Sequence, residues 1–239
     1  MLYDGERLDD LHRDGLRIIQ NPSKFCFGMD AVLLSDFAKV HKGQRHLDLC
    51  TGNGIVPILL CAKSKGESFF GIEIQKEMAE MATRSVSLNN LQGKVKIICG
   101  DIRLLTFAQK FDVVTANPPY MPIGGGAQSP TGANAIARHE IMCSLDDVVL
   151  AASQSLVPKG RFYMVHRPSR LADIFASFNA HRFAPKILQL VQSKAGQPPN
   201  LVLLMAIKDG GTGLDMPAPI IVYDNCGSYT DELKRIYYE

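Results

Sequence analysis

Residues 45–60 read Arg-His-Leu-Asp-Leu-Cys-Thr-Gly-Asn-Gly-Ile-Val-Pro-Ile-Leu-Leu, and this stretch decides the fold. Its opening apolar run is typical of a buried parallel strand, Gly52 and Gly54 indicate a tight turn, and the apolar segment after them is long enough for a helix. Strand, glycine turn and helix together begin a nucleotide-binding βαβ unit, whose helix N-terminus also suits an anion. A dinucleotide fingerprint requires a third glycine three residues after Gly54, but Pro57 stands there, so that pattern is incomplete.

The composition is that of one globular α/β domain. Of the 239 residues, 46% are hydrophobic and 21% are charged, and the chain is long enough to bury a full core. We expect a single domain over residues 1–239, with a hairpin-and-helix extension at 1–40, a core at 41–208, and a linker and tail at 209–239.

The sequence carries no sign of a membrane or secreted protein. No apolar run reaches the roughly 18 residues that a membrane span needs, and residues 1–10 are too polar and acidic for a signal peptide. The six cysteines form no Cys-x-x-Cys pair, which argues against a zinc site and a disulfide framework. We therefore expect a cytoplasmic protein with no metal and no membrane partner, while the net charge of +2 does not decide its partners.

The rest of the chain predicts a small hairpin followed by alternating strands and helices. Asp14-Gly15 indicates the hairpin turn within residues 6–20, and Met78 and Met81 fall at helical spacing as core residues. The strands are expected at 68–74, 94–99, 111–116, 160–166, 183–192 and 200–208, and the helices at 31–38, 55–63, 75–89, 144–157 and 167–180.

Two acidic residues follow predicted strands where a nucleotide could meet them. Glu73 lies about 20 residues after the glycine turn, the spacing of the acid that accepts hydrogen bonds from ribose hydroxyls. Asp101 follows the next strand, where its carboxylate could accept from an adenine amine. The alternatives are a solvated strand-end acid for Glu73 and a helix cap for Asp101.

Asn117-Pro118-Pro119-Tyr120 is the most specific signal in the chain. It follows the predicted strand 111–116, and ligands bind at the carboxyl ends of strands in open α/β sheets. The two prolines fix the backbone, so the Pro118 carbonyl can accept a hydrogen bond beside the amide oxygen of Asn117. Two acceptors and the flat ring of Tyr120 suit an amino group on a planar π-system.

With these residues, the chain resembles class I S-adenosylmethionine-dependent methyltransferases that carry an Asn-Pro-Pro-Tyr signature for amino-group methylation. Within them it is similar to the tRNA valine (adenine-37-N6)-methyltransferase family. The similarity extends to residues 27–34, 138–140, 194–200 and 221–223. Cys26 departs from the family, in which a basic residue is common, and this puts one RNA contact in doubt.

The resemblance implies a Rossmann-like class I fold: a seven-stranded, mostly parallel sheet with an antiparallel last strand. The antiparallel final pair distinguishes it from the dinucleotide fold. It also implies S-adenosylmethionine as cofactor, held by Phe27, Gly28, Asp30, Asp48, Cys50, Thr51, Gly52, Gly54, Glu73, Ile74, Asp101, Ile102 and Asn117. Phe27 could instead cap the core, and Asp30 could simply favour a helix dipole.

Residues 121–137 are rich in glycine and predict a mobile loop, which ends in Arg138-His139-Glu140. For this trio we favour a structural or RNA-positioning role over a general base.

Residues 158–194 hold seven basic residues and only one acid, Asp173, which indicates phosphate binding or else a solvated basic face. The residues expected to bind the substrate are Tyr120, Arg138, Arg167, Arg170 and Lys194.

We therefore expect methyl transfer to the N6 amine of an adenine in RNA, with adenine 37 of a tRNA anticodon loop as target. The catalytic residues would be Asn117, Pro118, Pro119 and Tyr120, in a monomer or weak homodimer. A protein-glutamine methyltransferase would use the same tetrapeptide, but those enzymes carry a helical domain in front and only 44 residues precede this strand. Two further functions stay open: methylation of a different nucleic-acid amino group, and RNA binding by a non-catalytic module.

Overall fold

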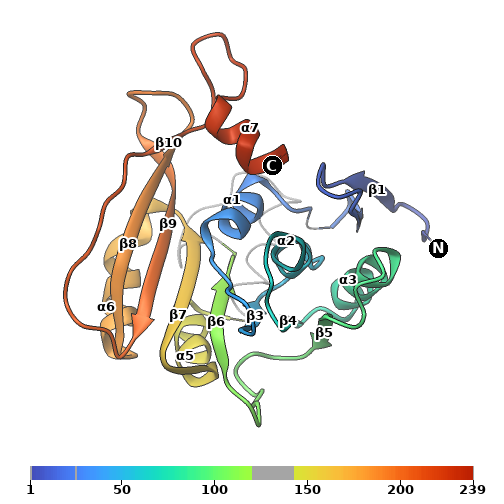
Figure 1. Ribbon diagram of the computed structural model, residues 1–239, viewed down its shortest axis with the longest axis horizontal. Helices are drawn as coiled ribbons and strands as arrows, with labels where there is room; N and C mark the ends of the chain where they lie inside the picture. Colours follow the sequence, from blue (N-terminus) through green and yellow to red (C-terminus); the bar gives the residue numbers. More distant parts are fainter. Residues whose placement is uncertain (1, 25, 120–142, 239) are drawn as a thin grey trace.

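A computed structural model describes residues 2–24, 26–119 and 143–238, and a large twisted sheet runs through its centre (Figure 1). The sheet has eight strands in the order β10-β8-β9-β7-β6-β3-β4-β5. Their bounds are β3 Arg45–Leu49, β4 Ser68–Glu73, β5 Val95–Cys99, β6 Phe111–Ala116, β7 Leu156–His166, β8 Phe183–Gln192, β9 Pro199–Lys208 and β10 Ile220–Ile221. Only β9 runs antiparallel to its neighbours, which confirms the expected class I methyltransferase-like sheet and its antiparallel strand.

Helices cover both faces of the sheet, because strands buried on two sides need two apolar layers. One face carries α1 Met29–Phe37, α2 Ile55–Lys63, α3 Lys76–Leu88 and α7 Asp231–Tyr238; the other carries α5 Leu145–Ser155 and α6 Leu171–Ala180 (Figure 1). Two separate clusters of buried side chains fill the spaces between the layers. A short 3-10 turn, Pro168–Arg170, leads into α6.

The predicted N-terminal hairpin is confirmed as β1 Arg7–Asp10 and β2 Arg17–Gln20, paired antiparallel. It packs on α3, where Ile19 joins Met78 and Met81 in a small buried cluster. The two methionines are therefore core residues, as their helical spacing predicted.

The register of the parallel strands brings the predicted site to one edge of the sheet. Leu49 pairs with both Ile72 and Ala116, and Glu73 pairs with Cys99. The residues that follow β3, β4, β5 and β6 therefore all emerge at the carboxyl edge.

Two expectations about the strands of the sheet are wrong. The strand expected at 160–166 begins at Leu156, because Leu156 already pairs with Phe111 of β6. The register to β6 shifts between this pair and the pair of Val113 with Arg161, and Lys159 in that interval has a left-handed φ of 64°. The sheet also has an eighth strand, because β10 forms a short parallel pair with β8. Two residues are too few for a periodic pattern to reveal a strand.

The segment expected as a tail contains a packed helix. Leu233 and Ile236 of α7 are 0% and 2% exposed and belong to the same buried cluster as α1 and α2. Within the described residues, no helix has the length and apolar character needed to cross a membrane.

We expect Leu233→Ala to lower the free energy of unfolding by about 2–4 kcal/mol, the usual cost of a cavity at a buried leucine. Urea denaturation measures this change. Lys234→Ala, at the exposed neighbour, is the control and should change stability by less than about 0.5 kcal/mol. Equal stability of the two variants would contradict the packing of α7.

Candidate active site

The glycine turn between β3 and α2 is built from left-handed backbone conformations. Cys50, Gly52 and Gly54 have φ values of 59°, 56° and 85°. A Cβ atom at Gly54 would lie 3.2 Å from the Cβ of Ala82, so glycine serves both the turn and the close approach of α3. The turn is tied to the sheet because the Thr51 N–H donates to the Ile72 carbonyl at 2.8 Å.

Glu73 locks this turn onto the end of β4. Its Oε2 accepts the Gly52 N–H at 2.9 Å, and its Oε1 accepts the backbone N–H of Gln75 at 2.9 Å and the Gln75 side-chain amide at 3.3 Å. The residue is only 5% exposed. The alternative of a solvated acid is wrong, and a carboxylate with about four acceptor positions still has capacity for a further donor.

Asp101 also lies at the carboxyl edge, but its carboxylate already has a partner. Arg103 forms a bidentate pair with it, in which Nε donates to Oδ1 at 3.0 Å and Nη2 donates to Oδ2 at 2.5 Å, and this pair lowers the pKa of Asp101. The backbone N–H of Arg103 donates to the same carboxylate at 2.9 Å. Sequence reasoning missed Arg103, although the Asp-x-Arg spacing signals such a pair. A ligand amine would have to share the carboxylate with this guanidinium.

A chain of buried polar side chains runs beneath the turn. The Thr115 hydroxyl donates to Asp48, and the same oxygen lies 2.9 Å from Nε2 of His46. Burial raises the pKa of Asp48 to about 7, although the Thr115 hydrogen bond opposes the shift, and burial lowers the pKa of His46 to about 3. Asp48 is therefore an internal hydrogen-bonding group that supports the turn from below. The sequence signal for these hydrogen-bonded side chains is the presence of polar residues inside two otherwise apolar strands.

Asn117 and Pro118 continue directly from β6. Ala116 pairs with Leu49 on one side and Met164 on the other, so Asn117 emerges between the glycine turn and the end of β7. Asn117 and Pro119 are half-buried and Pro118 is buried. Tyr120, the loop expected to be mobile at 121–137, and Arg138 with its two neighbours lie outside the described residues.

His166 ends the neighbouring strand β7, and sequence reasoning did not single it out. It is 2% exposed, and burial, helped by the charge of Arg170, lowers its pKa to about 4. Its Nδ1 accepts the Arg167 N–H at 2.8 Å, so the neutral ring carries its proton on Nε2. This places a neutral hydrogen-bonding ring beside the Asn117 strand.

The segment before α1 reaches the glycine turn through Gln20. Its Oε1 accepts the Phe27 N–H at 3.0 Å and an amide hydrogen of Asn53 at 3.4 Å. Gly28 is the N-cap of α1, and Asp30 accepts the N–H of Ala31 at 2.9 Å, in its first turn. Gln20 and Asn53 are almost fully buried and were missed, because no motif marks them.

The remaining predicted cofactor residues surround the turn and the two acids. Thr51 and Ile102 are buried, and Cys50 and Ile74 are half-buried. The nearby thiol of Cys143, followed by burial, raises the pKa of the Cys50 thiol well above its ordinary value. Cys50 is therefore a neutral thiol between the turn and the start of α5. In the described residues, no group of three or more metal-binding side chains comes together.

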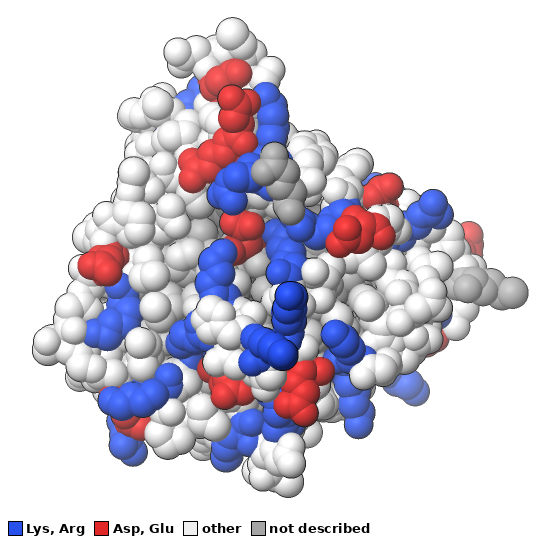
Figure 2. Space-filling view, in the orientation of Figure 1, with Lys and Arg blue, Asp and Glu red and all other residues white. Residues whose placement is uncertain are grey.

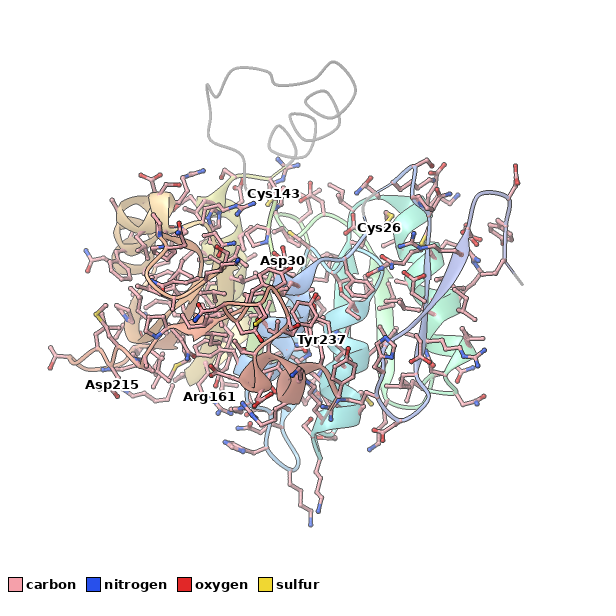
Figure 3. All side chains as sticks on the ribbon, turned by 90° about the horizontal axis from the view of Figure 1, so that it is seen from above. Cys26, Asp30, Cys143, Arg161, Asp215 and Tyr237 are labelled. Atoms are coloured by element: carbon pink, nitrogen blue, oxygen red, sulfur yellow. The ribbon has the colours of Figure 1, made fainter. Side chains whose placement is uncertain are left out.

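The basic residues of 158–194 lie in two separate groups. Arg167, Arg170 and Lys194 follow the carboxyl ends of β7 and β8, whereas the other four basic residues lie toward the amino ends of the same strands. Figure 3 shows Cys143 and Arg161 toward opposite sides of the molecule. The two groups lie toward opposite ends of two parallel strands of about ten residues each, although they are close together along the sequence.

A family model covers more than half of the chain. The model of the methyltransferase small domain family matches residues 23–179. The chain therefore belongs to the methyltransferase small domain family.

Curated relatives cover most of the chain. A protein of Aeromonas salmonicida named tRNA1(Val) (adenine(37)-N6)-methyltransferase is 28% identical over 211 residues, which are 85% of each chain. Proteins with the same name from Bacteroides fragilis and Porphyromonas gingivalis are 28% and 27% identical, over 74% and 87% of this chain and 75% and 86% of theirs.

Solved structures share the fold. A protein of Agrobacterium tumefaciens described as a predicted O-methyltransferase superposes with a TM-score of 0.70 at 25% identity, over 87% of this chain and 95% of that one. TrmN from Thermus thermophilus gives a TM-score of 0.56 at 20% identity, over 74% of this chain and 48% of that one. The latter likeness concerns the fold alone.

The raised pKa of Asp48 predicts a pH-dependent cost of folding. The folded protein keeps a proton that the unfolded chain releases above its ordinary pKa of 3.8, so this stabilisation is complete below about pH 4 and is lost as the pH rises toward 7. Asp48→Asn removes the titration and keeps an acceptor for Thr115. The free energy of unfolding of the variant, measured by urea denaturation relative to the wild type, should rise by roughly 1–3 kcal/mol when the pH is raised from 5 to 8.

The quantity compared is the difference in unfolding free energy between the variant and the wild type. Titrations common to both proteins, such as those of His46 and His166, therefore cancel. Asp112→Asn is the matched control, since Asp112 lies on the same strand as Thr115 but is partly exposed and accepts the Arg45 N–H at 2.8 Å. A stability difference for Asp48→Asn that is the same at both pH values would contradict the assignment.

Proposed function

We propose that this protein transfers a methyl group from S-adenosylmethionine to the exocyclic N6 amine of an adenine in RNA. One observation carries the proposal: Asn117-Pro118-Pro119 emerges between β3 and β7, at the same sheet edge as the hydrogen bond between Gly52 and Glu73. Cofactor and amine could therefore meet where four strands end. Membership of the methyltransferase small domain family supports the reaction class.

The residues at this edge fit S-adenosylmethionine. The turn brings the backbone close to a ligand without Cβ atoms at Gly52 and Gly54, and the N-terminus of α2 has no side-chain cap and suits a carboxylate. Glu73 would take the ribose hydroxyls and Asp101 the adenine amine. The bound cofactor would supply an electrophilic methyl group on a sulfonium, and the protein supplies position and dipoles.

The signature would orient the substrate amine. The Asn117 amide oxygen and the Pro118 carbonyl would accept its two hydrogens and point its lone pair at the methyl group. Tyr120 would stack on the base. A dedicated general base is not needed, because the methylated amine loses its proton readily.

We propose a tRNA anticodon loop as the substrate, with adenine 37 as the target. The names of the relatives from three genera support this choice. A loop base costs little to unstack, so a small enzyme can reach it. Arg167, Arg170 and Lys194 would hold backbone phosphates at the carboxyl edge and position the loop without reading its sequence.

The substrate is tested by offering labelled S-adenosylmethionine with tRNA transcripts, ribosomal RNA fragments and a peptide release factor. Label on N6 of adenine 37 is the expected product. Asn117→Ala should bind S-adenosylhomocysteine normally and lose roughly 10²–10³ in turnover, as removal of one preorganised polar group does. Methylation of the release-factor glutamine alone would overturn the RNA assignment, and full activity of Asn117→Ala would overturn the site.

The separation of the basic residues gives a second test by salt dependence. Arg167→Gln with Arg170→Gln should reduce the slope of log K for tRNA against log salt by about 1.4–1.8, the loss of two phosphate contacts. The matched control is Arg182→Gln with Lys186→Gln, at the other end of the same strands, which should leave the slope unchanged. Equal effects of the two pairs would contradict phosphate binding at the carboxyl edge.

A further inference from the structure

A pocket opens at the amino end of the sheet, away from the carboxyl edge. It has a volume of about 380 Å³ and is lined by four parts of the chain: the turn of the hairpin, the end of α1 with the residues that follow, the end of α2, and α7. Helix α2 begins at the glycine turn and is nine residues, about 13 Å, long, and its last turn, with Leu60 and Lys63, lines this pocket. The pocket is therefore separate from the candidate active site.

The charged side chains around the pocket are predominantly basic. Arg13, Lys39, Lys63 and Arg235 line it, and Asp36 is the only acid among its lining residues. Figure 2 views the molecule toward this end of the sheet and shows blue side chains gathered across the middle of the face. Four cations and one carboxylate leave a local excess of positive charge that attracts anions.

The ammonium groups of the two lysines already have hydrogen-bond acceptors within the protein. Lys39 donates to the Asp36 carbonyl at 2.7 Å, and Lys63 lies 3.4 Å from the Asp36 carboxylate and 3.3 Å from the Ile236 carbonyl. Helices α1 and α2 both end here, and helix C-termini favour cations. Burial nevertheless lowers the pKa of Lys63, and the neighbouring charges of Arg13 and Lys39 lower it further, against the opposing effect of Asp36.

The two arginines are different. Within residues 2–24, 26–119 and 143–238, neither Arg13 nor Arg235 forms an ion pair, and Nε of Arg13 is buried without a hydrogen-bond partner. A buried donor without an acceptor is costly, and a ligand that supplies acceptors removes the cost. Guanidinium groups match the oxygens of phosphate in bidentate geometry.

We propose that this pocket binds a small ligand with phosphate groups, such as pyrophosphate or the polyphosphate arm of a nucleotide. Its volume falls in the range of small-molecule sites, and cations from four separate parts of the chain that converge on one small volume suit a compact anion better than the continuous backbone of RNA. The ligand would bridge Arg13 of the hairpin and Arg235 of α7, with Lys39 and Lys63 beneath it. Binding would thereby tie both ends of the chain to α1 and α2.

Calorimetric titration with inorganic pyrophosphate tests the proposal. Saturating S-adenosylhomocysteine is present, so that the candidate active site is filled. The wild type should bind one pyrophosphate and unfold at a higher temperature with it, and a nucleoside triphosphate should compete. Arg13→Gln with Arg235→Gln should weaken pyrophosphate binding at least about tenfold, because two charge-assisted contacts are lost.

Arg182→Gln with Lys186→Gln removes the same charge outside the pocket and should leave pyrophosphate binding unchanged. The methyl-transfer rate of the Arg13→Gln, Arg235→Gln protein should also be unchanged. If that protein does not fold, Arg235→Gln alone, at an exposed position of α7, provides the comparison. Absence of pyrophosphate binding to the wild type, or equal binding by the pocket and control variants, would overturn the proposal. If the wild type does not bind pyrophosphate and the pocket variant loses tRNA binding, the proposal is overturned in favour of an RNA contact.

Discussion

The hydrogen bonds of the Glu73 carboxylate hold the carboxyl edge of the sheet together. One buried acid accepts backbone hydrogens from the β3–α2 turn at Gly52 and from the start of α3 at Gln75. A carboxylate at 5% exposure is costly unless it is paired, so the strand end and the two helix starts depend on one another. The backbone of the turn is left-handed at Gly54, and α3 lies so close that a Cβ atom there would come within 3.2 Å of the Ala82 Cβ. The proposed cofactor position follows from this arrangement.

Much of the fold could be predicted because strands buried on both faces give continuous apolar runs and amphipathic helices give a 3.6-residue period. The helix at 55–63, for example, has the expected bounds. The short strand β10 could not be predicted, since its two residues show no pattern and it forms only by pairing with β8. Helix α7 is stabilised mainly by contacts of Leu233 and Ile236 with distant residues, which local sequence does not reveal.

The candidate site could be predicted where strand ends carry the signal, as at Glu73 and Asn117. It could not be predicted where a side chain takes a partner of its own, as Asp101 does with Arg103, or where burial changes the chemistry of a group, as at Asp48 and His166. The division of the basic residues into two groups could not be predicted either, because strands of about ten residues carry their two ends to opposite sides of the molecule. Position along the chain predicts which residues follow a strand, but not which partners they find in space.

The central claim is that Glu73 both locks the glycine turn and accepts hydrogen bonds from the ribose of the cofactor. Calorimetric titration of Glu73→Gln with S-adenosylhomocysteine tests it most directly, since glutamine keeps the shape and removes one acceptor. The matched control is Glu77→Gln, on the exposed first turn of α3. We predict that affinity falls by about 1–3 kcal/mol in Glu73→Gln and stays unchanged in Glu77→Gln. Wild-type affinity in a folded Glu73→Gln protein would contradict the account.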